Sequence, residues 1–267
     1  DTFSFSNGGN DISISNVGNN DNKTTDVTIV KNSIKSKIKQ YNRSQVLNVT
    51  RSKYSKSGST ATGNGAVEVS DGLIFDARYG LRVQDEEISL NYPDVAKFLA
   101  VYESIDSQTP TLDVLQFSST VDVGTNAIIG ENILSKDSKT LARVVGKPDT
   151  HKLSIVYLTP SKFNSSDTVT FSESNIETSI QAVEIGIYKD ITNSFTLNKG
   201  QKDEFYDYSK LVRTKNVSEP KGPLLVVFDY YSVPSNDNGD VFTVVSYDKE
   251  RYSKDIPTIG LSNIRAT

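Results

Sequence analysis

Three carboxylates, Asp203, Glu204 and Asp207, lie close together in the sequence and are its best candidates for acid–base chemistry. A pair of carboxylates can hydrolyse a glycosidic bond when the fold holds the two groups about 5 to 10 Å apart across a cleft. Aromatic residues are interleaved with these acids, which is typical of a strand or turn that packs its rings on a sheet and exposes its acids to water. The pattern therefore favours a structural segment over a catalytic pair.

His151 is the only histidine, so a histidine general base or a histidine zinc ligand would have to be this residue. It follows Pro148, Asp149 and Thr150, which are typical of an exposed turn. The chain has no cysteine, which excludes a cysteine nucleophile, a thiolate metal site and disulfides. We therefore expect no enzyme activity, no metal site and no cofactor.

The run Asp237-Asn238-Gly239-Asp240 carries oxygen ligands and a glycine, as calcium-binding loops do. It lacks the roughly twelve-residue spacing and the final bidentate glutamate of an EF-hand. The polar run Asn19–Asn22 has the same shortcomings. We interpret both as ordinary turns, the first at the tip of a hairpin.

Positive charge is concentrated in one part of the sequence. Eight basic residues and no acid lie between Val27 and Val67, so with a net charge of −4 the rest of the chain carries −12. The eight are Lys31, Lys35, Lys37, Lys39, Arg43, Arg51, Lys53 and Lys56. Our first interpretation is an edge strand protected by lysines, and our second is a patch that contacts an acidic neighbour. Nucleic-acid binding ranks third because stacking aromatics are few here, and we expect no nucleic-acid partner.

Size and composition are those of a folded protein of more than one module. The chain has 267 residues, of which 36% are hydrophobic and 23% charged. That length lies near the size at which a single core divides. No run approaches the roughly 18 apolar residues of a membrane-spanning helix, so we expect no membrane insertion. Methionine is absent throughout, and we expect the chain to be a segment of a longer polypeptide.

Short β-branched and aromatic runs, separated by Asn, Asp, Gly, Ser and Pro, predict strands along most of the chain. Asp11–Asn16 alternates with a period of two, and Ser33–Gln40 fits a strand better than a helix. Val95–Glu103 could form a helix, but we favour a buried strand. Leu224–Phe228 is apolar on both faces, which predicts a central strand. Further strands are expected at Asp26–Val30, Gln45–Arg51, Leu73–Val83, Ile88–Tyr92, Pro110–Phe117, Val183–Tyr188, Ser194–Leu197 and Val241–Tyr247.

The region Gly124–Ala182 has four or five evenly spaced short strands and no helix-length amphipathic segment, which predicts a small barrel. We therefore expect an all-β fold with little or no helix, built from several small antiparallel β-sandwich or barrel modules in series. The predicted modules are 1–71 with the basic stretch, 72–123 packing on its neighbours, 124–185 as the barrel, and 186–267 as a β-sandwich.

Three phrases of the sequence resemble large structural proteins of contractile-tailed phages, notably cyanophages and relatives of the T-even group. The first is Phe98–Ser104. The second consists of Ile128–Ile133, Thr140–Val145 and Val156–Leu158. The third is Leu197–Tyr208, followed by Leu224–Tyr231 and Gly239–Phe242. The resemblance covers about Gly72 to Thr267, and the third phrase is the most specific.

This resemblance implies a virion protein of the tail, in the baseplate or the fibre-attachment region, made in the cytoplasm of the host bacterium. Its partners would be other tail proteins and copies of itself. The alternative is a receptor-binding module of a tail fibre that recognises a host surface glycan. The resemblance supplies no catalytic residues. Charge-patterned and tyrosine-rich faces would form the contacts, and the candidate interface residues are Lys35, Lys37, Lys39, Arg43, Phe205, Tyr206, Tyr208, Tyr230 and Tyr231.

Overall fold

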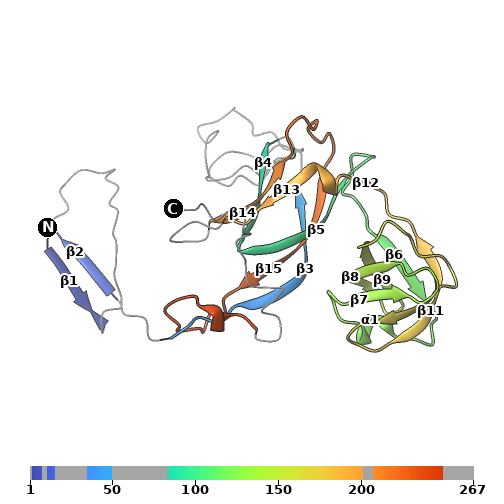
Figure 1. The fold of residues 1–267 in the computed structure, drawn as a ribbon, viewed down its shortest axis with the longest axis horizontal. Coiled ribbons are helices and arrows are strands. Elements are labelled where there is room, and N and C mark those ends of the chain that lie inside the picture. The colour runs from blue at the N-terminus through green and yellow to red at the C-terminus, as the bar shows by residue number, and fades with distance from the viewer. Residues whose placement is uncertain are drawn as a thin grey trace, which may run out of the picture. The chain divides into compact units, whose positions relative to one another are not determined.

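The structure is a computed structural model that describes residues 2–7, 11–15, 35–49, 83, 85–200 and 207–248 (Figure 1). The chain divides into two units, residues 1–34 and residues 35–267. In the first unit, β1 (Thr2–Ser6) and β2 (Asp11–Ser15) pair as an antiparallel hairpin. This confirms the strand predicted from the alternation of Asp11–Asn16. The predicted strand Asp26–Val30 lies outside the described residues, as does Leu73–Val83 apart from its last residue.

The larger unit contains two antiparallel sheets packed as a sandwich. The first sheet has the strand order β12-β5-β15-β3, and the second has the order β13-β14-β4. Their strands are β3 (Gln40–Val49), β4 (Glu87–Pro93), β5 (Val95–Glu103), β12 (Lys189–Asp190), β13 (Phe195–Asn198), β14 (Tyr208–Arg213) and β15 (Leu224–Ser232). One buried cluster joins the sheets, with Ile88 and Leu211 from the second and Val226 and Phe228 from the first.

Strand β15 is central in its sheet and buried on both faces. It pairs with β3 on one side and β5 on the other, as its apolar sequence predicts. Leu224, Val226 and Phe228 point into the core between the two sheets. The alternate residues Leu225 and Val227 belong to a different cluster on the opposite face. Because successive strand residues face opposite sides, one strand supports two cores.

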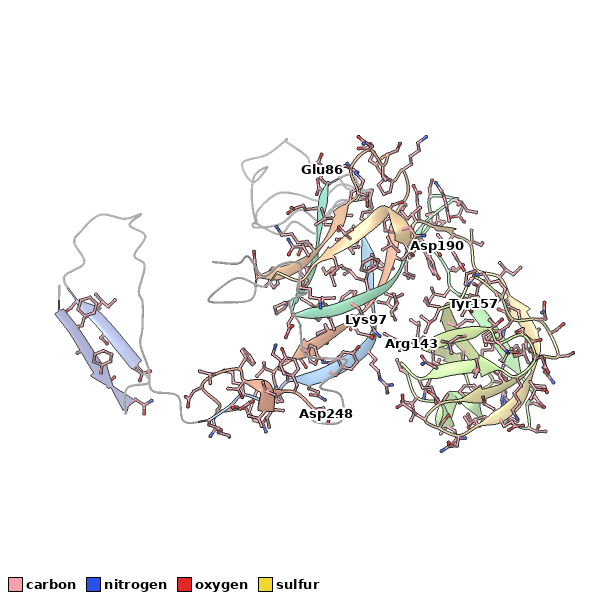
Figure 2. The ribbon with its side chains drawn as sticks, viewed as in Figure 1. Glu86, Lys97, Arg143, Tyr157, Asp190 and Asp248 are labelled. Atoms are coloured by element: carbon pink, nitrogen blue, oxygen red, sulfur yellow. The ribbon has the colours of Figure 1, made fainter. Side chains whose placement is uncertain are left out.

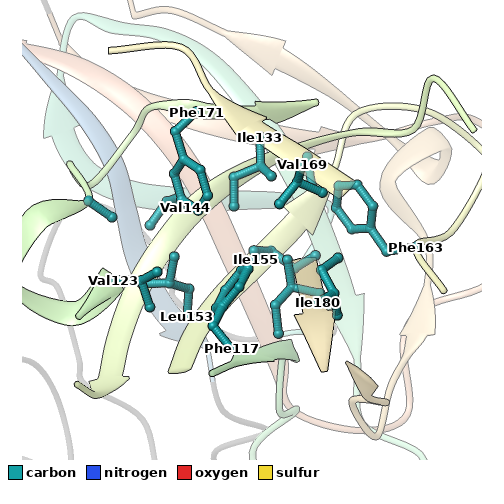
Figure 3. Packing of buried hydrophobic residues seen from close by; sticks show 13 residues of the cluster. Phe117, Val123, Ile133, Val144, Leu153, Ile155, Phe163, Val169, Phe171 and Ile180 are labelled. Carbon is teal, nitrogen blue, oxygen red and sulfur yellow. The ribbon is translucent and has the colours of Figure 1, made fainter. Parts of the chain in front are cut away.

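The second cluster joins the sandwich to a closed six-stranded barrel with the order β10-β11-β6-β9-β8-β7. The barrel strands are β6 (Asp113–Phe117), β7 (Asn132–Ser135), β8 (Leu141–Asp149), β9 (Lys152–Tyr157), β10 (Thr168–Phe171) and β11 (Glu177–Glu184). Side chains such as Phe117, Ile133 and Phe171 fill its interior (Figure 3). The short helix α1 (Val123–Asn126) contributes the buried Val123. The barrel predicted from short, evenly spaced strands is therefore present.

The module boundaries differ from those predicted. The barrel begins with β6, which lies in the predicted segment 72–123, and not at residue 124. The sandwich takes β3 from 1–71, β4 and β5 from 72–123, and β12 to β15 from 186–267. The barrel is thus inserted between two strands of the sandwich. The physical reason is that β15 needs apolar neighbours on both edges, and the strands that supply them lie before the barrel in the sequence.

Most of the individual strand predictions agree with the structure, and three do not. Of Val183–Tyr188, only Val183 and Glu184 lie in a strand, at the end of β11. Val95–Glu103 is the strand β5, and Ile88–Tyr92 lies within β4. The described part of Ser33–Gln40 is irregular before Gln40, which begins β3, and its one isolated β-bridge pairs Ser36 with Val241. The predicted strand Val241–Tyr247 contains instead the 3₁₀ turn η4 (Val244–Ser246), and a second such turn, η3 (Thr192–Ser194), precedes β13. Among the described residues, no helix has the length and apolar character needed to cross a membrane.

Candidate functional site

The candidate interface residues predicted from the sequence separate into three places. Lys35, Lys37 and Lys39 lie on the segment that leads into β3, and Arg43 lies on β3 itself. The tyrosines Tyr208, Tyr230 and Tyr231 lie on β14 and β15. Phe205 and Tyr206 lie outside the described residues, as do Asp203 and Glu204, two of the three candidate carboxylates; the third, Asp207, directly precedes β14.

The ammonium group of Lys39 is enclosed by aromatic rings. Its Nζ lies 4.8 Å from the ring centres of Phe242 and Tyr247 and 5.6 Å from that of Tyr231. It also pairs with the carboxylate of Asp94, and only 2% of its side chain is exposed. A lysine held in this way binds within its own chain, so the structure removes Lys39 from the set of residues that could meet a partner.

Backbone and side-chain bonds hold the segment before β3 to the loop that follows β15. The amides of Lys37 and Lys39 donate to the carbonyls of Val241 and Ser246 at 2.7 and 2.8 Å. The carboxylate of Asp237 accepts from the amides of Ile38 and Gly239, and these bonds hold the pKa of Asp237 below its usual range. The run containing Asp237 is thus a turn that binds the chain's own amides. We call the contact between residues 35–39 and 233–248 the clasp.

Arg43 makes the type of contact that was expected of the basic stretch, but within the chain. It forms a two-pronged ion pair with Glu173 of the barrel, in which the Nη2–Oε2 distance is 2.9 Å. Its Nη1 also donates to the carbonyl of Gly130 at 3.1 Å. Gly130 has a positive φ of +87°, and a Cβ there would collide with Cβ of Arg43. The basic residue therefore fixes one module on its neighbour.

An ion pair that the sequence analysis missed lies at the same junction. Asp229 is fully buried on β15, and Arg143 of β8, which is labelled in Figure 2, donates from Nη1 to its Oδ2 at 2.9 Å. The same carboxylate accepts from the hydroxyl of Tyr41 and the amide of Ser44, both at 2.8 Å. Lys97 on β5 lies 3.6 Å away. The sequence signal was present, since a charge within an otherwise apolar central strand requires a buried partner.

A third contact at the junction is a polar cluster around Asp113. Tyr188 donates to its Oδ2 at 2.6 Å, and Lys162 lies 3.2 Å from the same oxygen. The ring of Tyr188 stacks on that of Tyr102, with centres 3.9 Å apart. Burial, with the bond to Asp113, raises the pKa of Tyr188 far above its usual range, and burial followed by the charge of Asp190 does the same for Tyr102. Both phenols therefore stay protonated well above neutral pH, and Tyr188 acts as the hydrogen-bond donor to Asp113.

The other residues considered for chemistry have structural partners. His151 lies in the turn between β8 and β9, and its Nδ1 lies 3.1 Å from the carbonyl of Val121. Glu131, which was not among the candidates, is fully buried and also has structural partners, since it accepts bonds from the amides of Ile128 and Ser174. In the part of the chain that the structure describes, no three or more His, Cys, Asp or Glu side chains are arranged to hold a metal ion.

Two of the candidate tyrosines, Tyr230 and Tyr231, pack on other aromatic rings. Tyr230 lies with its ring centre 4.3 Å from that of Tyr92, and burial raises the pKa of Tyr230. Tyr231 is buried, and its ring centre lies 5.1 Å from that of Tyr41. Tyr208 begins β14 and is half-buried. Among the described tyrosines of this set, Tyr230 and Tyr208 thus keep part of their surface exposed.

No protein-family model, curated protein or solved structure matches the chain.

Proposed function

We propose that the chain is a structural, non-enzymatic component of a phage virion tail, in the baseplate or the fibre-attachment region. Its partners are other tail proteins and further copies of the same chain, and it requires no cofactor. It acts passively: the barrel and the sandwich are held at a fixed spacing and present fixed surfaces to their neighbours.

The observation that carries this proposal is where the resembling phrases meet in the fold. The cluster between barrel and sandwich has six buried residues, Ala100, Tyr102, Val145, Val156, Leu225 and Val227. All six belong to the three phrases that resemble phage structural proteins. Arg143 and Asp229 belong to them as well. The resembling phrases therefore supply the residues that are buried between the barrel and the sandwich. A rigid spacer needs such a fixed junction between its modules.

Rigidity of the junction has two further physical supports. Domains within one chain move relative to each other unless their interface is extensive and apolar. Here the barrel is inserted, so the chain enters it after β5 and leaves it before β12, and both crossings lie beside the buried cluster. The ion pairs Arg143–Asp229 and Arg43–Glu173 add directional contacts beside the apolar cluster. Such a unit would hold the proteins bound at its two modules at a fixed distance from each other.

The test is to purify particles of the phage that encodes the chain and to reconstruct the tail by electron cryo-microscopy. We expect the chain at a symmetric position, with residues 83–248 contacting other virion proteins. A chain that is absent from purified particles, or present but touching nothing, contradicts the proposal. Saturable binding of the purified chain on a glycan array would instead favour a receptor-binding module, and polysaccharide cleavage would show an enzyme.

A further inference from the structure

The clasp joins the segment before the first strand of the sandwich to the segment after its last strand. Residues 35–39 come directly before β3, and residues 233–248 come directly after β15 (Figure 1). A pull that enters the chain at Lys35 and leaves it at Asp248 therefore reaches the clasp before it reaches a strand of the sandwich. The response of the clasp to such a pull depends on the directions in which its two segments run.

The two segments of the clasp run parallel to each other. Ser36 and Val241 form a parallel β-bridge. The hydroxyls of Ser36 and Thr243 share a hydrogen bond of 2.7 Å, and the amide of Lys39 donates to the carbonyl of Ser246 at 2.8 Å. Residues that come later in the first segment thus pair with residues that come later in the second.

Parallel pairing decides how tension acts on these bonds. In a parallel pair, the start of one segment and the end of the other lie at opposite ends of the pairing. A pull on Lys35 and Asp248 therefore slides the two segments past each other along their length. Sliding loads the hydrogen bonds of the clasp together, whereas separating two adjacent ends would break them one after another.

The strand pair behind the clasp has the opposite geometry. Strands β3 and β15 are antiparallel, and their register sets Gln40 opposite Ser232. Gln40 is the first residue of β3 and Ser232 is the last residue of β15, so both lie at the same end of the pair. With the clasp open, the same pull would separate this end and unzip β3 from β15 one residue pair after another. The clasp therefore keeps tension away from the weak direction of the sandwich.

We propose that the clasp is a mechanical clamp, which bears tension applied to the sandwich through residues 35 and 248. Lys39 strengthens the clamp, because its ammonium group lies among three aromatic rings and pairs with Asp94, between β4 and β5. The inference goes beyond the proposed function, since resistance to tension is a property of the single chain. In a phage tail, it would let the chain carry load as well as hold a fixed spacing.

Single-molecule force spectroscopy of the full chain tests this inference, because introduced thiols are unique handles in a chain without cysteine. Lys35→Cys with Asp248→Cys slides the two segments past each other. The matched control is Lys35→Cys with Asn238→Cys, which opens the clasp from one end, since the side chains of Lys35 and Asn238 meet there. The first rupture should need at least about twice the force in the sliding variant, because several hydrogen bonds must break together.

A second comparison asks whether the clasp itself carries the load. A Cβ at Gly239 would lie 2.6 Å from backbone atoms of Lys37, so Gly239→Ala forces the two segments apart. Added to the sliding variant, it should lower the rupture force to that of the control, whereas Ser235→Ala, at an exposed position of the same loop, should not. Equal forces in the two pulling directions, or a sliding force that Gly239→Ala leaves unchanged, would overturn the inference. Both measurements use the purified chain, so their outcome is independent of whether the chain is found in virions.

Discussion

Arg143 on barrel strand β8 and Asp229 on sandwich strand β15 form a buried ion pair across 86 positions of sequence, with 2.9 Å between Nη1 and Oδ2. Arg143 also donates from Nε to the side chain of Asn132 at 3.2 Å, which fixes the direction of the guanidinium. Removing two charges from water is costly, and the cost is offset only when each has well-placed partners. The pair is therefore sensitive to any change that separates barrel from sandwich.

Arg143→Met should lower the free energy of unfolding by about 3 kcal/mol, because it leaves the Asp229 carboxylate buried without its closest cation. The measurement is chemical denaturation of the purified chain. The matched control is Lys136→Ala, which breaks the exposed pair Lys136–Glu177 of the same barrel. That change should cost less than about 1 kcal/mol. Equal costs for the two variants would mean that the buried pair is no more important than a surface pair.

Gly130→Ala should destabilise the chain by about 2 kcal/mol or more, since alanine is strained at a positive φ and its methyl group collides with Arg43. The control is Gly146→Ala, where the new Cβ would lie 3.6 Å from Cβ of Ser154, an ordinary contact. The denaturation midpoint should fall clearly for Gly130→Ala and change little for Gly146→Ala. A harmless Gly130→Ala would show that Arg43 and the barrel do not meet as closely as described.

Local patterns were sufficient to predict the all-β class, the barrel and the central position of β15. The apolar run Leu224–Phe228 has no polar face to offer to water, so burial on both sides follows from its residues alone. The order of the modules did not follow from local patterns. Pairing of β15 with β3 and β5 joins segments far apart in the chain, and strand alternation carries no information on which distant strand is the partner.

At the candidate site too, local sequence patterns predicted the kind of contact but not the distant residue that makes it. Arg43 was expected to contact a neighbouring module, and it does contact one, but the partner Glu173 could not be chosen among many acids by sequence. Lys39 was grouped with Lys35 and Lys37 because a lysine is normally exposed. Its burial depends on rings contributed by Phe242 and Tyr247, which reach it through the loop after β15. The strand predicted at Val241–Tyr247 failed for that reason: this loop turns back to enclose a lysine.

The stability of the chain should decline at alkaline pH through its buried phenols. Burial raises the pKa of Tyr157 from 10.0 to about 12. A phenol whose folded pKa is raised contributes stability that is complete below pH 10.0, the unfolded value, and is lost as the pH rises through about 12. The denaturation midpoint of the unchanged chain should fall as the pH rises across that window. The midpoint of Tyr157→Phe should fall less steeply. Parallel curves for the two proteins would show that this phenol does not titrate differently in the folded state.

The clasp should open when the charge of Lys39 is removed. Lys39→Met keeps an apolar stem among the rings of Tyr231, Phe242 and Tyr247 but loses the cation and the bond to Asp94. A desolvated cation–π contact is worth up to about 2 kcal/mol, so the amide hydrogens of the clasp should exchange about tenfold faster or more.

Hydrogen exchange at the amides of Lys37 and Lys39 measures this opening directly, because both donate across the clasp. The matched control is Lys37→Met, two residues away on the same segment, where the side chain is more exposed. It should leave exchange at Lys39 nearly unchanged. If both variants speed exchange equally, the backbone bonds alone hold the clasp and the aromatic enclosure of Lys39 contributes nothing. If only Lys39→Met does so, the charge within the rings keeps the loop after β15 closed on the segment that leads into β3.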